Sequence, residues 1–342
     1  MIPQRSRFNL VAFAPYIALL LMLLVGSLTS EHFFQLRNVL NITRQVSYTG
    51  IIALGMTFVI IAGGIDLSVG SAVAFIGGVV VLSINHIFLV VWPGAEYTAF
   101  CLAFIAGLAV GLVGSGVSGF LITKFNIPPF IATLGFMGIY RSLALYIGDG
   151  GEFRVTGSFG IFSRFGTGLI LGVPTPSIIF FLLAAVFSLI LNWTRFGRYV
   201  CAIGSNEKVA SYAAVRVAMV RMLTYIICGG TVALSTFLLA ARMNSINSTN
   251  AGNLYELDAI AAVVIGGTAM TGGSGSMAGT VAGAMILGII NNILNMWGVS
   301  AYLQGTVKGL IIVLAVLIQR QEFQDLVKEG IMRIFRLREK AK

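Results

Sequence analysis

Long apolar runs, separated by short polar segments, follow one another along almost the whole of the 342-residue chain. A helix that crosses a bilayer needs roughly 20 mostly apolar residues, and ten runs approach or reach that length. They cover about 10–29, 46–63, 69–91, 98–121, 129–148, 176–193, 220–241, 257–270, 276–296 and 303–319. The runs at 46–63 and 257–270 are short or interrupted. The pattern predicts an all-α integral membrane protein with about ten transmembrane helices.

The composition supports this class. Hydrophobic residues make up 57% of the chain and charged residues only 10%, whereas a soluble domain carries about 25% charged residues. An ordinary soluble enzyme, a disordered protein and a nucleic-acid binder are therefore excluded. The formal net charge of +10 has another explanation, because Lys and Arg concentrate in the cytoplasmic loops of membrane proteins.

The distribution of Lys and Arg gives an orientation. If the N-terminus lies inside, fifteen of these residues fall in inner segments, five fall in outer segments, and Arg141 and Lys308 fall within runs. This excess predicts that both termini are cytoplasmic. Arg5 and Arg7 precede an apolar run that is long for a signal peptide and is followed by no A-x-A-like site, so we expect an uncleaved first helix.

Two loops and the tail carry further structure. The Gly-rich stretch 149–175 is expected outside, and the basic stretch 194–219 is expected inside with one or two short helices. We expect residues 1–320 to form the transmembrane domain. Residues 321–342 are expected to be a cytoplasmic tail, which is either an amphipathic helix on the inner membrane surface or a solvated basic segment.

Two glycine-rich motifs have the same form, Gly-Gly, five residues, Gly-Ser. One begins at Gly63-Gly64 and contains Asp66 and Ser68, and the other begins at Gly266-Gly267. Irregular backbone at membrane depth is tolerated only against protein or a water-lined cavity. The motifs are therefore either path-lining breaks between half-helices or tight cytoplasmic turns.

Small residues also recur at helical spacing elsewhere. One row comprises Gly107, Gly111, Gly114 and Gly119, and another pairs Gly279 with Gly283. Spacing of this kind lets helix backbones approach closely. We predict that these glycines serve packing.

A few polar side chains fall inside apolar runs or beside the glycine motifs. The charged ones are Asp66, Arg141, Glu256 and Asp258, and intramembrane charges are functional candidates by default. Asp66 has a structural alternative, because an aspartate before a helix caps free N–H groups. Asn291, Asn292 and Asn295 form a stripe that is expected to hydrogen-bond either sugar hydroxyls or neighbouring helices.

Several kinds of chemistry are absent from the sequence. No Gly-Lys dipeptide occurs, so there is no Walker A loop to bind nucleotide phosphates. Ser118 lies in a G-x-S-G sequence, but His32 and His86 are expected toward the other side of the membrane, out of reach of such a nucleophile. Two separated His and three scattered Cys predict neither a metal site nor a disulfide framework. We expect no catalytic residue, no metal and no cofactor.

Four segments resemble the ribose-type permease subunits of ABC sugar importers, and the likeness extends over about 40–320. They are Gly55–Ser71, Asn126–Gly135, Gly197–Glu207 with its Gly-Arg-Tyr start, and Tyr255–Thr268. The first and last of these motifs are highly specific together. The resemblance implies a type II ABC importer-like permease.

The resemblance also implies partners. Such permeases dimerise with a second permease subunit, here expected to be a second copy, and receive a monosaccharide from an extracytoplasmic sugar-binding protein. A separate ABC ATPase binds a short coupling helix after the sixth span, and Gly204, Asn206, Glu207 and Ala210 fall on that motif. Relatives usually have glycine where this chain has Ala214, which leaves the end geometry of that helix open.

The leading hypothesis is therefore the permease subunit of an importer for ribose or a related sugar. The substrate path is expected at the glycine motifs, Asp66, Ser68 and the asparagine stripe. The alternatives are a self-sufficient secondary carrier for a small polar solute and a membrane-embedded enzyme. The enzyme alternative requires a nucleophile–base pair that the sequence does not show.

Overall fold

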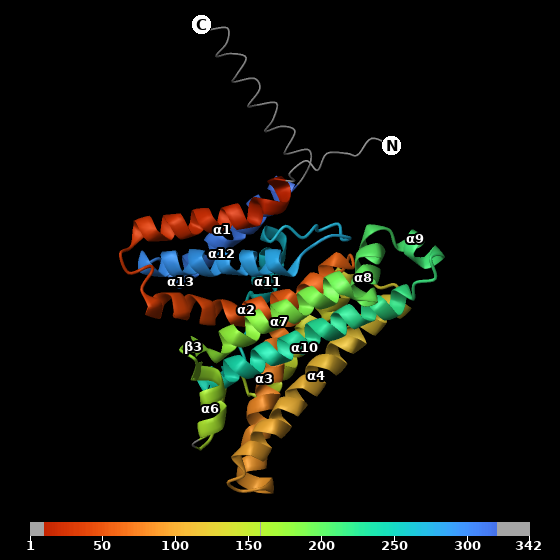
Figure 1. Ribbon diagram of the computed structural model, residues 1–342. Coiled ribbons are helices and arrows are strands. Elements are labelled where there is room, and N and C mark those ends of the chain that lie inside the picture. The colour runs from red at the N-terminus through yellow and green to blue at the C-terminus, as the bar shows by residue number, and fades with distance from the viewer. Residues whose placement is uncertain (1–9, 158, 320–342) are drawn as a thin grey trace, which may run out of the picture. The chain divides into compact units, whose positions relative to one another are not determined.

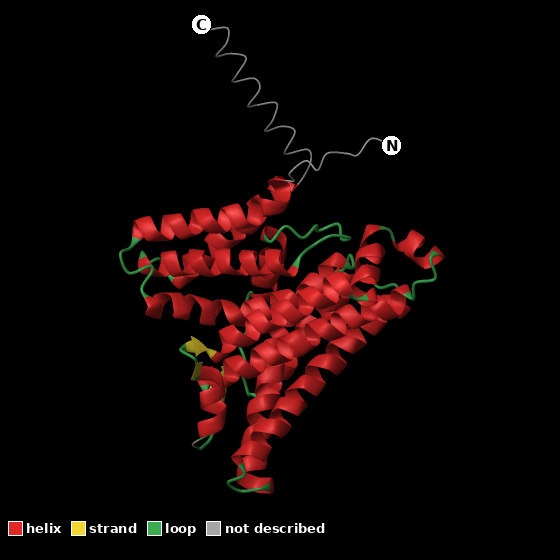
Figure 2. Cartoon of the chain, in the orientation of Figure 1, coloured by secondary structure: helices red, strands yellow, loops and turns green. Residues whose placement is uncertain are grey.

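The structure is a computed structural model that describes residues 10–157 and 159–319, and it is built almost entirely of helices (Figures 1 and 2). The first half contains α1 (Leu10–Thr29), α2 (Leu36–Ile61), α3 (Val69–His86), the π-helix η1 (Ile87–Val91), α4 (Glu96–Lys124), α5 (Pro129–Ile147), β1 (Glu152–Arg154) and α6 (Gly160–Thr167). The second half contains β2 (Leu169–Ile170), β3 (Val173–Pro174), α7 (Thr175–Trp193), α8 (Arg195–Ser205), α9 (Glu207–Tyr212), α10 (Val217–Met243), β4 (Ser245–Asn247), α11 (Tyr255–Ile265), α12 (Met277–Met296) and α13 (Ala301–Gln319).

Within the described residues, seven helices are long and apolar enough to cross a membrane: α2, α3 with η1, α4, α5, α7, α10 and α12. The sequence predicted ten spans. One difference is a correction, because the run predicted at 257–270 contains only the 11-residue helix α11. At 1.5 Å per residue, this helix is about half as long as the hydrocarbon core is thick. The glycines after Ile265 end it early.

Helix α2 begins ten residues earlier than the predicted run at 46–63. Its first three turns carry polar side chains that a hydropathy reading assigns to a loop. Some of them have partners inside the protein, as where Asn38 exchanges two hydrogen bonds with Asn292 of α12. Every residue from Gly50 to Ile61 is buried, which makes α2 a central helix surrounded by protein.

Helix α10 is the other central element, and it packs against α2, α3, α4 and α6 (Figure 1). Its contact with α4 depends on small residues. A Cβ on Gly111 would lie 2.5 Å from the carbonyl oxygen of Gly229, and a Cβ on Gly119 would lie 3.1 Å from the side chain of Tyr225. The glycine row of α4 therefore serves close helix packing, as the sequence predicted.

The strands are short and tie loops together beside the helices (Figure 2). β1 pairs antiparallel with β4, with Phe153 opposite Ile246, and both side chains are buried. β2 and β3 form a small antiparallel hairpin. The predicted loop 149–175 thus contains β1, α6 and this hairpin, and β1 holds the irregular segment between α10 and α11 in place.

The chain divides into two compact units, Met1–Ile293 and Leu294–Lys342. In the second unit, Gln304 of α13 donates hydrogen bonds to the Asn295 side chain and to the carbonyl of Val299. These bonds fix the start of α13 to the end of α12. The predicted tail at 321–342 lies outside the described residues.

Candidate functional site

The first glycine motif ends α2 with a Schellman cap. Gly63 has φ +79°, in the left-handed region that glycine adopts without strain. The Gly63 N–H bonds to the carbonyl of Ile60, and the Gly64 N–H bonds to that of Val59. These are the two hydrogen bonds of the motif. The motif is thus a helix end, from which residues 62–68 lead to α3.

The second motif ends α11 in the same way but one residue out of register. Here the left-handed residue is Gly267, with φ +84°, and the N–H groups of Gly267 and Thr268 bond to the carbonyls of Val264 and Val263. Gly63 therefore corresponds to Gly267, not to Gly266. Gly266 is needed for packing, because its Cβ would lie 2.5 Å from the carbonyl carbon of Gly279 in α12.

Asp66 is fully buried in the turn that leads into α3. Its Oδ1 accepts hydrogen bonds from the N–H of Ser68 (2.9 Å) and from the Ser68 hydroxyl (2.6 Å). Ser68 is the N-cap of α3, so Asp66 holds the cap residue rather than capping the helix itself. Its Oδ2 is buried and has no hydrogen-bond partner in the structure. The side chain thus retains a free acceptor beside the start of α3.

A cavity of about 290 Å³, lined by both polar and apolar groups, lies between α3, α5 and the segment before α11. Arg141 of α5 reaches across it and donates hydrogen bonds to the carbonyls of Ser248 (2.9 Å), Thr249 (2.9 Å) and Ala251 (3.1 Å). Sequence reasoning singled out Arg141 as an intramembrane charge but gave it no partner. The partners are backbone carbonyls of a non-helical segment, which no residue pattern identifies.

The predicted asparagine stripe is divided among different partners. Asn292 is paired with Asn38 of α2, and Asn295 accepts a hydrogen bond from Gln304. The Oδ1 of Asn291 is buried and has no hydrogen-bond partner in the structure. Two of the three side chains therefore bind neighbouring helices, which was one of the two alternatives.

The predicted inner loop 194–219 forms the two short helices α8 and α9. Gly204, in the last turn of α8, lies against the end of α2 and the loop that follows α11. A Cβ there would overlap the carbonyl oxygen of Ile61 and the nitrogen of Gly273. The N–H of Gly273 also bonds to the Ile61 carbonyl at 2.8 Å. Three chain segments thus meet at this point through backbone atoms, and we call Ile61, Gly204 and Gly273 the backbone junction.

Helix α9 presents polar groups on its exposed side. Asn206 is its N-cap and accepts a hydrogen bond from the N–H of Val209. Glu207 is half exposed and pairs with Arg221 of α10 at 2.8 Å, while Ala210 is buried. A surface hollow of about 690 Å³ is lined by α9 and the start of α10. The four residues that the sequence singled out therefore lie around one exposed helix and its base.

Helix α9 ends in a Schellman cap in spite of having alanine at the left-handed position. Ala214 has φ +58°, and the N–H groups of Ala214 and Val215 bond to the carbonyls of Ser211 and Ala210. The left-handed cap geometry is therefore formed with alanine in place of glycine. For an L-residue with a Cβ, this conformation costs roughly 1–2 kcal/mol.

We expect Ala214→Gly to stabilise the protein slightly. The substitution relieves the left-handed strain, while the greater freedom of glycine in the unfolded chain offsets part of the gain. The net increase is expected to be below about 1 kcal/mol, measured as a rise in the melting temperature in detergent. Ala213→Gly is the matched control, because Ala213 has φ −82° and should only lose stability.

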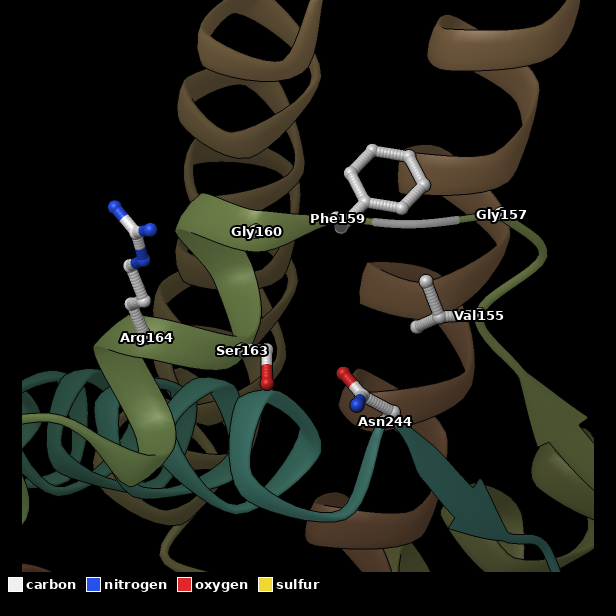
Figure 3. Close-up of a pocket in the computed structure, with 7 residues that line it drawn as sticks. All are labelled: Val155, Gly157, Phe159, Gly160, Ser163, Arg164 and Asn244. Atoms are coloured by element: carbon white, nitrogen blue, oxygen red, sulfur yellow. The ribbon is translucent and has the colours of Figure 1, made fainter.

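A second, open pocket of about 590 Å³ lies on the side of the protein that carries α6 and β1. Figure 3 shows the side chains of Ser163 and Asn244 near the same opening as Phe159, with Arg164 extending from α6. Nearby, hydrogen bonds from the Ser245 hydroxyl and Arg154 lower the pKa of the Glu152 carboxyl. This face therefore offers an amide and a hydroxyl near an aromatic ring, with the side chain of Arg164 on the other side of α6.

No group of three or more His, Cys, Asp or Glu side chains within residues 10–157 and 159–319 is arranged to hold a metal ion. Ser118, which the sequence placed in a protease-like motif, is buried and donates its hydroxyl to the carbonyl of Ser115. Its hydroxyl is thus engaged in a helix.

Comparison with known proteins gives consistent relatives. A family described as branched-chain amino acid transport system / permease component matches residues 38–316. The ribose import permease protein of Bacillus subtilis is 40% identical over 90% of this chain and 92% of its own length. The galactofuranose transporter permease protein and the xylose transport system permease protein of Escherichia coli are 33% and 32% identical over about nine-tenths of each chain. No solved structure matches.

The family match covers most of the chain, and the relatives align along nearly its full length. The helical architecture, the two capped glycine motifs and the exposed α8–α9 pair lie within the matched region. This chain is therefore a multi-pass membrane permease that belongs to the family described as branched-chain amino acid transport system / permease component.

Proposed function

We propose that this chain is the membrane-spanning permease subunit of an ABC importer that carries a monosaccharide, ribose or a related sugar, into the cytoplasm. The observation that carries the proposal is the 40% identity to ribose import permeases over 90% of the chain. The absence of a Walker A sequence agrees with an energy source on a separate ATPase subunit. The same relatives argue against the self-sufficient secondary carrier.

The family description names branched-chain amino acids, which makes these a second candidate substrate. The relatives favour a sugar, because the matched permeases are named for ribose, galactofuranose and xylose. The cavity also offers polar side chains for sugar hydroxyls, among them Ser142, Asn253 and Glu256, beside the apolar side chain of Met137.

We further propose that the chain crosses the bacterial inner membrane ten times. Helices α1 and α13 add two passages to the seven long helices. The tenth is discontinuous and consists of β4, the non-helical residues 248–254 and the short helix α11. The excess of Lys and Arg in inner segments then places both termini and the α8–α9 pair in the cytoplasm.

The translocation path is proposed to follow the irregular segments at 62–68 and 266–273, with Gly63, Gly64, Asp66, Ser68, Gly266 and Gly267. Backbone groups of such segments are exposed, which is tolerated where they line a water-filled route. Asn291, whose amide oxygen has no partner, is a further candidate. The path is proposed to be completed by a second copy of this chain.

Two surfaces of the protein are proposed to bind the remaining partners, the ATPase and the sugar-binding protein. The exposed helix α9 and the hollow beside it are proposed to receive the ABC ATPase. The pocket of Figure 3, with Arg164 and Asn244, lies on the opposite side and is proposed to receive an acidic side chain of an extracytoplasmic sugar-binding protein.

The decisive experiment is transport in proteoliposomes that contain this chain with the ATPase that co-purifies with it. Uptake of labelled D-ribose would support the proposal if it requires two components: the sugar-binding protein on the extracytoplasmic side of the membrane and ATP on the ATPase side. Uptake by this chain alone under an ion gradient would contradict it and support a secondary carrier. Competition by leucine, but not by unlabelled sugars, would instead assign an amino acid substrate.

Glu207→Lys is expected to weaken binding of the ATPase without unfolding the membrane domain. The substitution reverses the charge of an exposed side chain on α9 and places it beside Arg221. Loss of an exposed ion pair costs less than about 1 kcal/mol, so folding should survive. The measurement is sugar-stimulated ATPase activity of the reconstituted complex, which we expect to fall about tenfold or more, as for one lost charge-assisted contact.

Arg221→Ala is the matched control, because it breaks the same ion pair from the side of α10. If its ATPase activity is as low as that of Glu207→Lys, the defect lies in the ion pair and not in docking. Normal activity in Glu207→Lys would remove α9 from the docking surface.

A further inference from the structure

The cavity between α3, α5 and α11 is bounded by elements that begin or break within the membrane-spanning part of the chain. α3 begins at Val69 and α11 begins at Tyr255, so the positive ends of two helix dipoles are close to it. Its volume of about 290 Å³ is at the small end of ligand sites, which range from about 300 to 1,000 Å³. A ligand of this cavity must therefore be small.

Glu256 lines one wall of the cavity, and its carboxylate fits there only because the neighbouring backbone has glycines. Its carboxylate lies directly over Gly70, where a Cβ would overlap Oε2 and would also collide with the carbonyl oxygen of Gly252. Gly252 in turn has φ +69°, which brings its carbonyl close to α3. Two glycines thus make room for one carboxylate beside the first turn of α3.

Arg141 fixes the opposite wall. Its guanidinium uses three hydrogen bonds on the carbonyls of Ser248, Thr249 and Ala251, which holds the non-helical segment that precedes Gly252 and Asn253. Arg141 therefore positions the segment from which Asn253 faces the cavity.

We propose that this cavity is a subsite for one monosaccharide on its way through the permease, with Glu256 accepting sugar hydroxyls and Arg141 as a positioning residue. The proposal rests on the proposed function and adds a contact site to it. The two oxygens of a carboxylate accept hydrogen bonds from neighbouring hydroxyls, and hydrogen bonds to a charged group are the stronger kind. The amide of Asn253 and the hydroxyl of Ser142 supply donors for the ring and hydroxyl oxygens.

The first test compares Glu256→Gln with Glu256→Leu in the reconstituted complex, with D-ribose as the probe. The glutamine amide oxygen still accepts from a hydroxyl, so uptake should remain within about threefold of the wild type. Leucine accepts nothing, and a lost hydrogen bond to a charged group corresponds to a loss of about 10- to 100-fold. Glu31→Gln, an exposed carboxylate in the turn between α1 and α2, is the control.

Two results would overturn the proposal. Wild-type uptake in Glu256→Leu would mean that the carboxylate does not contact the sugar. Equal losses in Glu256→Gln and Glu256→Leu would mean that the negative charge itself is needed, as for a substrate that carries an ammonium group. If the wild-type complex transports no monosaccharide at all, the proposed function has failed instead.

The second test does not depend on transport. Ser142→Cys places a thiol on the α5 side of the cavity, in a chain whose native Cys101, Cys201 and Cys228 are changed to Ser. D-ribose, but not leucine, is expected to slow its reaction with a small polar thiol reagent. Adding Arg141→Gln should raise the ribose concentration for half-protection about tenfold while ATPase co-purification is unchanged. Absence of ribose protection in the parent variant would overturn the subsite.

Discussion

A single methyl group at position 204 is expected to abolish most ATP-dependent sugar uptake. Gly204 meets the ends of two other segments through backbone atoms only, and the Cβ of Gly204→Ala would overlap the carbonyl oxygen of Ile61. Because these contacts are with backbone atoms, no change of side-chain rotamer can relieve the overlap, and the backbone itself must shift. Overpacking of this kind costs about 1–3 kcal/mol.

The position of the backbone junction explains why transport should suffer more than folding. Gly204 is the base of the α8–α9 pair, Ile61 immediately precedes the capped end of α2, and Gly273 lies in the loop between α11 and α12. A shift there separates α8 and α9, the proposed docking helices for the ATPase, from both glycine motifs. We expect at least a tenfold fall in uptake, as follows from about 1.4 kcal/mol, with near-normal amounts of protein in the membrane.

Gly116→Ala is the matched control for this experiment. A Cβ at Gly116 would make only ordinary contacts with Ile226, at 3.5 Å and 3.7 Å. Uptake and ATPase co-purification are measured for both variants at equal protein level. If Gly204→Ala transports as well as Gly116→Ala, the backbone junction does not link the α8–α9 pair to the glycine motifs.

Within the second glycine motif, Gly266→Leu is expected to be far more damaging than Gly267→Leu. The Cβ of Gly266 would lie 2.5 Å from the carbonyl carbon of Gly279 and 2.7 Å from the nitrogen of Thr280. A side chain there must push α11 away from α12. At Gly267 the nearest atom is 3.4 Å away, and the cost is limited to the left-handed conformation, about 1–2 kcal/mol.

The measurement is the fraction of protein that elutes as a single species in detergent after heating, together with uptake normalised to protein level. We expect Gly266→Leu to lose both heat stability and uptake. Gly267→Leu should remain folded, with reduced uptake. Gly63→Leu should resemble Gly267→Leu, since Gly63 has the corresponding cap position and no atom within 4 Å of its Cβ. A larger loss in Gly267→Leu than in Gly266→Leu would contradict the assignment of the two glycines.

Much of the fold could be predicted from the sequence because the membrane imposes a simple rule. In hydrocarbon, every backbone N–H and C=O must be paired within the protein, so long apolar runs become helices. The runs corresponding to α3, α4, α5, α7, α10 and α12 were predicted for this reason. The two short helices in 194–219 and the packing role of Gly111, Gly119, Gly279 and Gly283 were also predicted, because local spacing and polarity contain that information.

The sequence failed where side chains find partners far along the chain. The start of α2 carries Asn38, whose polarity indicates a loop until Asn292, 254 positions away, supplies its hydrogen bonds. The repeated Gly-Gly letters suggested equivalent positions at Gly63 and Gly266. Backbone angles instead pair Gly63 with Gly267.

The candidate site divides in the same way. The sequence by itself determined which residues are exceptional: Asp66, Arg141 and Glu256 are charges among apolar neighbours, and the resemblance to sugar-importer permeases singled out Gly204 as part of an expected coupling motif. Only the tertiary structure decided what each one does. Arg141 binds backbone carbonyls, Glu256 lies over Gly70, and Gly204 has no room for a methyl group. Such contacts depend on backbone atoms, which are the same in every residue type, so no pattern of side chains along the chain specifies them.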